Sequence, residues 1–297
     1  MGGIIMNVLL VGADGQLGLE LIKTASGKIN FCTYTFEQLD ITDPVAVQEV
    51  VEKTKPDWVI NAAAYTAVDK AEEERDKAFA VNQIGAGNVA KAAKQANVQL
   101  VHISTDFVFD GNKSIPYLID DKPNPLNVYG ESKLAGDNEV LAILPDTSAI
   151  IRTAWVYSSY GNNFVKTMLG LMSERDELSV VADQIGSPTW ANGLAMAIWQ
   201  IIEKKIHGLF HWTDAGVASW YDFAVAIQEE ALATGILDNS HSCTVKPIRT
   251  EDYPTAAIRP QNCVLDKTTT WQALGVAPTH WRVALRQMMS ELKQHDC

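Results

Sequence analysis

The sequence predicts an α/β protein with a doubly wound, mostly parallel sheet of the Rossmann type and a smaller, interleaved C-terminal domain. Short apolar segments alternate with helical patterns through the first half of the chain, which is typical of a parallel sheet covered by helices. A glycine-rich turn joins the first apolar segment to the first helical pattern, as in doubly wound sheets. After about residue 155 the alternation loosens, and every tryptophan except Trp58 lies in this second half. We therefore expect one domain over residues 1–155 and a second mainly over 156–297, with some segments returning to the first.

The individual elements follow from apolar runs and helix-start signals. Asn7 to Val11 is a short apolar run, as in a strand buried on both faces. Pro44 directly follows Asp43, which suits the start of a helix. In the first domain we expect strands at 7–12, 30–35, 57–62, 98–104 and 148–154, and helices at 16–25, 44–54, 74–96 and 128–144. In the second half we expect helices near 163–174, 190–204, 219–234 and 278–293.

Composition excludes several classes of function. The chain has 297 residues, of which 47% are hydrophobic and 20% are charged, as in an ordinary globular protein. A formal net charge of −12 disfavours a nucleic-acid partner. The cysteines at 32, 243, 263 and 297 have neither metal-ligand spacing nor the density of a disulfide framework, which fits a cytoplasmic protein. No apolar run approaches a membrane span, and the first six residues are too short for a signal peptide. We expect no metal site and no membrane partner.

The glycine-rich turn predicts a nucleotide site. Gly12, Gly15 and Gly18 stand three residues apart between the apolar run and a helical pattern that includes Leu17, Leu21 and Ile22. Glycines at such a turn let the backbone approach a diphosphate, which the N-terminus of the following helix then binds. The alternative is an ordinary glycine-rich loop.

Two further motifs predict proton chemistry. Tyr129 and Lys133 are four residues apart in an expected helix, so they share a face, and a nearby ammonium would lower the phenol pKa from its usual ~10. The alternative is a half-buried Tyr beside a solvated Lys. The strand before them ends in Ser104, Thr105 and Asp106, where a hydroxyl could share a proton with Tyr129 and bind a substrate carbonyl. The alternative there is a turn or a helix cap.

Together these motifs resemble the extended short-chain dehydrogenase/reductase superfamily and, within it, the dTDP-4-dehydrorhamnose reductase family. The resemblance covers nearly the whole chain, and residues 61–72 and the block from Arg152 to Tyr157 narrow it to this family. Further matching segments lie at residues 104–109, 125–136, 161–164, 183–189 and 259–260.

The resemblance implies reduction, with NADPH or NADH, of the C4 keto group of dTDP-6-deoxy-L-lyxo-4-hexulose to dTDP-L-rhamnose, a precursor of cell-wall polysaccharide. Tyr129 would protonate the oxygen, Lys133 would bind the nicotinamide ribose and lower the Tyr129 pKa, and Thr105 would hydrogen-bond the carbonyl. Phe107 replaces a Tyr found in well-known members. The cofactor-binding residues implied are Gly12, Gly15, Gln16, Leu17, Gly18, Asp40, Ile41, Ala63, Ala64, Tyr65, Thr66, Tyr129 and Lys133. The substrate-binding residues implied are Thr105, Asp106, Trp155, Gln184 and Arg259.

The choice between the two cofactors is the least determined feature. The second strand ends in Thr35, Phe36 and Glu37, without the acid that binds a ribose hydroxyl or the Arg that binds a 2′-phosphate. We therefore expect similar efficiencies with NADPH and NADH. The resemblance places Asp40 on the adenine amine and Ile41 on the ring, whereas the alternative for Asp40 and Asp43 is helix capping.

Two rival functions stay open. One is another sugar-nucleotide epimerase or dehydratase of the superfamily, although dehydratases usually carry an acidic pair after the Thr and here Phe107 follows Asp106. The other is a non-catalytic, NADP-binding regulatory subunit, because the family resembles the partner of an adenosylmethionine synthetase. A monomer and a homodimer both fit the sequence, and nothing in it supports the Mg²⁺ ion for which the family leaves room.

Overall fold

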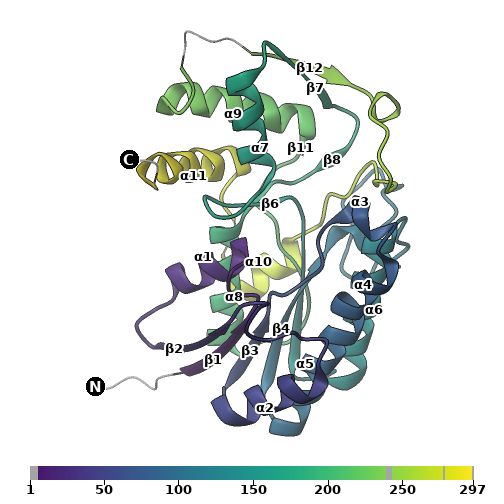
Figure 1. Ribbon diagram of the computed structural model, residues 1–297, viewed down its shortest axis with the longest axis vertical. Helices are drawn as coiled ribbons and strands as arrows, with labels where there is room; N and C mark the ends of the chain where they lie inside the picture. The colour runs from purple at the N-terminus through teal and green to yellow at the C-terminus, as the bar shows by residue number, and fades with distance from the viewer. Residues whose placement is uncertain (1–5, 239–242, 277, 296–297) are drawn as a thin grey trace.

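A computed structural model describes residues 6–238, 243–276 and 278–295. Its lower lobe, as drawn in Figure 1, is built on a six-stranded parallel sheet with the strand order β10-β5-β4-β3-β1-β2. The strands are β1 (Met6–Val11), β2 (Ile29–Tyr34), β3 (Trp58–Asn61), β4 (Gln99–Thr105), β5 (Ser148–Thr153) and β10 (Gly208–His211). The order reverses between β1 and β3, and in open α/β sheets ligands bind at such a point.

Helices cover both faces of this sheet because alternate residues of its strands point to opposite sides. Leu9 and Val11 pack in one core cluster with α2 (Pro44–Thr54), α5 (Ala86–Ala96) and α6 (Val128–Ile143). Val8 and Leu10 pack in the other with α1 (Gln16–Thr24), α8 (Ala191–Lys204) and α10 (Thr268–Leu274).

The upper lobe packs three helices over short strands (Figure 1). The helices are α7 (Phe164–Glu174), α9 (Trp220–Thr234) and α11 (Trp281–His295). The strands pair two by two: β6 (Val156–Tyr157) with β9 (Thr189–Trp190), β7 (Glu177–Val181) with β12 (Thr244–Ile248), and β8 (Ile185–Gly186) with β11 (Ala218–Ser219). The chain returns to the lower lobe in α8, β10 and α10, which pack on or extend the sheet.

Most expected elements begin and end within a residue or two of their observed bounds, and α2 matches the expected range 44–54. The helix expected at 74–96 is a continuous run of α4 (Arg75–Phe79), a π-helical turn η1 (Ala80–Gly85) and α5. The last helix was expected from residue 278 and begins at Trp281. In α1, Leu17 and Leu21 are buried as expected, but Ile22 is 41% exposed, because it lies beyond the face that packs on α8. The sequence did not predict four features: the short strands of the upper lobe, strand β10, helix α3 (Val68–Ala71) and helix α10.

Candidate active site

The glycine-rich turn lies at the switch point of the sheet. Gly12 has a φ of +78°, and a Cβ there would stand 2.6 Å from the backbone nitrogen of Ala63, at the end of β3. A Cβ on Gly18 would stand 2.4 Å from the carbonyl oxygen of Gly12. Gly15 precedes α1 and offers no side chain to cap it. Gly12 and Gly18 therefore leave backbone, without side chains, beside a helix N-terminus, which is the cradle that a dinucleotide diphosphate requires.

The neighbouring cofactor positions differ in what they expose. Gln16 accepts a hydrogen bond from the Asn163 side chain at 2.9 Å, whereas the Leu17 side chain is buried in the core. Asp40 accepts hydrogen bonds from the backbone and the hydroxyl of Thr42 at 2.9 and 2.8 Å. Ile41 is only 3% exposed, so little of its side chain can meet an adenine ring. Asp43 caps the N-terminus of α2, which confirms the helix-capping alternative for this residue.

The segment that follows β3 runs beside the glycine-rich turn, and two asparagine side chains hydrogen-bond its backbone. Ala63 donates to the Asn61 side chain at 3.2 Å, and Tyr65 donates its backbone N–H to Asn82 at 2.9 Å. Ala64 is half-buried and Thr66 is exposed. The Tyr65 hydroxyl donates to Glu74 at 2.9 Å, which leaves mainly the backbone of this segment to face a ligand.

Close packing brings Tyr129 to the end of β4. A Cβ on Gly130 would stand 2.2 Å from the carbonyl oxygen of Phe107, so the first turn of α6 approaches the short helix η2 (Asp106–Val108). The rings of Tyr129 and Phe107 meet edge to face at 5.7 Å. The Thr105 hydroxyl accepts from Phe107 N at 3.2 Å, so the predicted capping alternative is observed, and it donates to Asp106 at 3.1 Å. Its interaction with Tyr129 acts on the pKa of that phenol.

The expected low pKa of Tyr129 is wrong for this structure. Burial raises the pKa of Tyr129 to about 12, the hydrogen bond from Thr105 opposes this, and the charges of Asp106 and Asp137 add to it. Lys133 lies one turn further along α6, but its ammonium donates to the carbonyl oxygen of Ile103 at 2.6 Å. The alternative of a solvated Lys is also wrong, because Lys133 is 2% exposed, and burial lowers its own pKa to about 8.

A buried polar cluster behind these residues was not predicted. Asp137 follows Lys133 by one turn and accepts from Ser104 at 2.9 Å and from Arg152 at 3.4 Å. His102 faces it at 3.8 Å, and burial holds the pKa of His102 well below its usual range. The repeated four-residue spacing of Tyr129, Lys133 and Asp137 is a signal that could have identified Asp137.

The predicted substrate residues form two groups. Asp106 is buried, its Oδ2 has no hydrogen-bond partner among the described residues, and burial raises the pKa of this carboxyl to about 7. Trp155 has a left-handed φ of +46° and stacks on Trp220 at 3.5 Å. A Cβ on Gly186 would stand 2.7 Å from the Trp155 ring, so Gly186 leaves the space that the indole fills. Asp106 and Trp155 therefore lie just beyond the ends of the neighbouring strands β4 and β5.

Gln184 and Arg259 have protein partners. Gln184 donates to the Thr250 hydroxyl at 3.1 Å. Arg259 forms a two-pronged ion pair with Asp69 on α3, at 3.2 and 2.7 Å, and this pairing lowers the pKa of Asp69. Arg259, which a surface position before Pro260 would also explain, is half-buried, and its segment crosses from the upper lobe to the lower one.

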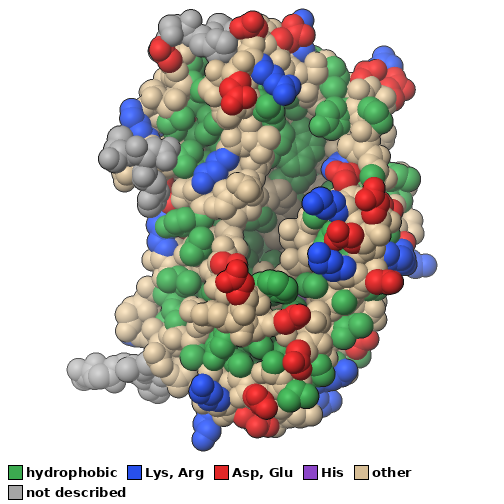
Figure 2. Space-filling view, in the orientation of Figure 1, with side chains coloured by type: hydrophobic (Ala, Val, Ile, Leu, Met, Phe, Trp, Pro, Cys, Tyr) green, Lys and Arg blue, Asp and Glu red, His purple; other side chains and the backbone are tan. Residues whose placement is uncertain are grey.

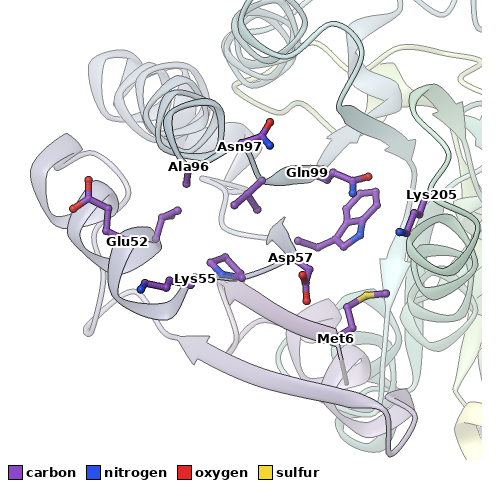
Figure 3. A pocket seen from close by; sticks show the side chains of 12 residues that line it. Met6, Glu52, Lys55, Asp57, Ala96, Asn97, Gln99 and Lys205 are labelled. Carbon is purple, nitrogen blue, oxygen red and sulfur yellow. The ribbon is translucent and has the colours of Figure 1, made fainter. Parts of the chain in front are cut away.

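Figure 2 shows the molecular surface hollowed between the two lobes, with acidic and basic side chains gathered along one rim. A separate cavity of about 520 Å³ lies elsewhere, where Met6, Trp58 and Gln99 begin β1, β3 and β4 (Figure 3). Its lining includes Lys55 and Lys205, which end α2 and α8, and none of the predicted site residues. This cavity lies at the amino ends of the strands, opposite the edge where such sheets bind ligands.

Among the described residues, no group of three or more His, Cys, Asp or Glu could hold a metal ion. No helix in the described part of the chain is long and apolar enough to cross a membrane.

Comparison with known proteins identifies the family. The profile of the RmlD substrate binding domain matches residues 6–294. The chain belongs to this family. The dTDP-4-dehydrorhamnose reductase of Aggregatibacter actinomycetemcomitans is 45% identical over 289 residues, which are 95% of this chain and 97% of that protein. That of Escherichia coli K12 is 40% identical over 296 residues, covering 97% and 98%.

Solved structures of the RmlD family agree with the fold. The Bacillus anthracis dTDP-4-dehydrorhamnose reductase in complex with NADP has a TM-score of 0.91 at 38% identity and covers 97% of this chain and 100% of its own. The Clostridium acetobutylicum orthologue also has a TM-score of 0.91, at 41% identity, with the same coverage. A Thermus thermophilus UDP-glucose 4-epimerase, at 17% identity and a TM-score of 0.77, shares the fold alone. The Rossmann-type α/β fold expected from the sequence is confirmed.

Proposed function

We propose that the protein is an NAD(P)H-dependent dTDP-4-dehydrorhamnose reductase, which reduces the C4 keto group of dTDP-6-deoxy-L-lyxo-4-hexulose to give dTDP-L-rhamnose. The observation that carries the proposal is the meeting of Thr105, Tyr129 and Lys133 at the carboxyl end of β4, on the same sheet edge as the Gly12 cradle. Close relatives over nearly the whole length are named as reductases of this substrate.

The backbone around Gly12 fits a dinucleotide. The tight turn that Gly12 and Gly18 permit, and the uncapped N-terminus of α1 that follows it, would hold the diphosphate, while Ala63, Ala64 and Tyr65 would line the nicotinamide half through their backbone. When bound, the reduced dinucleotide supplies the hydride. Lys133 would bind the ribose hydroxyls. In that position its ammonium would lower the phenol pKa of Tyr129, which burial raises in the structure.

Tyr129 and Thr105 would act on the keto oxygen. Both hydroxyls donate hydrogen bonds to the oxygen as negative charge develops on it, and such aimed donors are a strong source of transition-state stabilisation. Tyr129 then transfers its proton to that oxygen as a general acid. A phenol with a raised pKa keeps its proton until the alkoxide forms, so the Tyr129 of the structure is in the state that the reduction needs.

The upper lobe would bind the sugar nucleotide. Asp106 and Trp155 would contact the sugar, Gln184 would lie nearby, and the guanidinium of Arg259 would bind diphosphate oxygens with the N–H groups that Asp69 leaves free. On this view residues 1–155 mainly bind the dinucleotide and 156–297 mainly bind the substrate. We place the enzyme in the cytoplasm, in the supply of an activated deoxysugar for cell-surface polysaccharide, as a monomer or a homodimer.

Incubation with the dTDP-linked 4-keto-6-deoxy-L-sugar tests the proposal. The reductase must oxidise one reduced cofactor per sugar and release a product of rhamno configuration. Thr105→Val should slow this reaction and leave cofactor affinity nearly unchanged. Sugar turnover without net cofactor oxidation would instead identify an epimerase, and cofactor binding without turnover would identify a binding subunit.

Cofactor preference is tested in the same assay. No Lys or Arg occurs between residues 29 and 52, which span the end of β2, and Thr35 donates its backbone N–H to Gln38 at 3.0 Å. We expect NADPH and NADH to give similar kcat/KM values. A hundredfold preference, equal to about 2.7 kcal/mol, would show that another residue reads the 2′ position.

A further inference from the structure

Lys133 has an unusual environment for an ammonium group. It is 2% exposed, and the hydrogen bond that the structure shows for it is the one to the Ile103 carbonyl. Removing an ammonium from water without a compensating charge favours its neutral form. A neutral lysine would lose one of the N–H groups that orient it and would exert no electrostatic effect on Tyr129.

Asp137 is the compensating charge nearest along the helix. It is fully buried at 0% exposure and follows Lys133 by one turn, so the two side chains lie on one face of α6. Its Oδ2 accepts from Ser104 and Arg152, whereas its Oδ1 has no hydrogen-bond partner among the described residues. The carboxylate is therefore anchored through Oδ2, and its Oδ1 lies 3.8 Å from His102 Nε2.

The residues that hydrogen-bond Asp137 are neighbours of the residues that contact Lys133 and Tyr129. Ser104 stands on β4 between Ile103, which holds the Lys133 ammonium, and Thr105, which bonds Tyr129. Burial raises the pKa of the Asp137 carboxyl, and the charges of Arg152 on β5 and of Lys133 oppose this rise. The other charged and titratable groups that interact with Lys133 or Asp137 are His102, Tyr129 and Arg152. Burial holds the pKa of His102 well below its usual range, and Asp137 is the carboxyl whose charge raises the pKa of Lys133 against the effect of burial.

We propose that Asp137 is a positioning residue, which keeps Lys133 protonated and seated on the Ile103 carbonyl so that it can serve the ribose and Tyr129. The proposal rests on the proposed reductase function for its catalytic consequence. The effect of Asp137 on the charge state of Lys133 does not depend on that function and can be tested separately.

The direct test is the titration of Lys133 in the protein without ligands. Lysine labelled with ¹³C at Cε reports protonation by NMR, and loss of one signal in Lys133→Met assigns it. We expect Asp137→Asn to lower the Lys133 pKa by about one unit or more, because an opposite charge within ~4–6 Å of an ionisable group shifts its pKa by about that amount. Asp137→Glu, which keeps the charge, should restore most of the value. The control is Glu139→Gln, which removes a half-buried carboxylate from the same helix and should leave Lys133 unchanged.

Kinetics supply the second readout. If Lys133 must be protonated, kcat/KM falls as pH rises through its pKa, and Asp137→Asn should move this alkaline limb to lower pH, with Asp137→Glu close to the unsubstituted enzyme. A role confined to packing would lower thermal stability without moving the limb or the NMR titration, and that result would overturn the proposal. If Asp137→Asn does not fold, a Lys133 pKa below about 7 in the unsubstituted protein overturns it equally. Absence of any keto-sugar reduction, with the lysine titration as expected, would reject the proposed function and leave the Asp137 assignment in place.

Discussion

Tyr129 shows how a single side chain depends on its surroundings. Burial and the charges of Asp106 and Asp137 raise the phenol pKa to about 12, so the hydroxyl is protonated at neutral pH in the protein without ligands. A proton donor is what a carbonyl reduction needs, and a low pKa in the unliganded protein is not required for it.

We expect Tyr129→Phe to retain reduced-cofactor affinity and lose most turnover. The ring and its contact with Phe107 remain, whereas the transferable proton is removed. General acid catalysis contributes ~10²–10⁴-fold, and kcat should fall by that factor. Steady-state kinetics measure the loss of turnover, and fluorescence titration with the reduced cofactor measures the retained affinity. Turnover within a few-fold of the unsubstituted enzyme would contradict the role of Tyr129.

A second residue, Asp214, makes stability depend on pH. Asp214 is buried, accepts from Trp190 N at 2.9 Å, and burial raises its pKa from 3.8 to about 7. Between these values the folded protein holds a proton that the unfolded chain has lost, so the free energy of unfolding falls as pH rises through this window. The full effect is about 4 kcal/mol.

Asp214→Asn removes this dependence, because an amide does not ionise. The variant should therefore gain stability relative to the unsubstituted protein as pH rises from about 4 to about 7, and the difference should then level off. Urea unfolding across this range measures it. Asp146→Asn, at an exposed position, is the control. A difference independent of pH would show that Asp214 ionises normally.

At the scale of elements, the cap of helix α9 positions an aromatic stack in the upper lobe. The Ser219 hydroxyl accepts from Asp222 N at 3.0 Å, and the Asp222 carboxylate accepts from Ser219 N at 2.9 Å, which makes a reciprocal cap. Trp220 is the first residue of the helix and stacks on Trp155. The cap therefore sets the position of the ring on which Trp155 rests.

Ser219→Ala should lower the free energy of unfolding by about 1 kcal/mol and change the near-UV circular dichroism of the stacked indoles. Ser219→Thr keeps an acceptor oxygen and should be close to the unsubstituted protein. Equal stability of the Ala and Thr variants would mean that packing alone holds the start of α9.

For the whole molecule, α1 is one of the elements that join the two lobes. Glu20 on α1 is fully buried, accepts from Ser158 at 2.8 Å and Asn192 at 3.0 Å, and pairs with Lys23 at 3.6 Å. Lys23 also pairs with Glu291 on α11 at 2.5 Å. The helix that begins at the glycine-rich turn is thus tied through one polar stripe to the upper lobe.

We expect Glu20→Ala to destabilise the protein by about 3 kcal/mol, because it leaves buried donors without an acceptor and Lys23 without one of its partners. Urea unfolding measures the change. Glu203→Ala, an exposed acid on α8, should stay within about 0.5 kcal/mol of the unsubstituted protein. A similar small effect for Glu20→Ala would mean that the lobes are joined mainly by apolar contacts.

The sequence by itself determined the elements whose signals are local. The helix at 44–54 was predicted to the residue because Asp43 and Pro44 mark its start and an apolar face runs through it. The four inner strands β1, β3, β4 and β5 were predicted because a strand buried on both faces is largely apolar, and the edge strand β2 was predicted as well. The two-residue strands of the upper lobe and the edge strand β10 were not, because their hydrogen-bond partners lie far away in the chain and their own residues carry no distinctive period.

For the site, the sequence determined which groups stand at the end of each strand and in the first turns of α1 and α6. Tertiary structure alone decided their chemical state. Burial, which depends on every packed neighbour, raised the pKa of Tyr129 and lowered that of Lys133, contrary to the reasoning from spacing. The partners of Arg259 and Asp137 come from other elements, and such contacts have no local sequence signal, because ion pairs in a folded core are set by where strands and helices meet and not by their order in the chain.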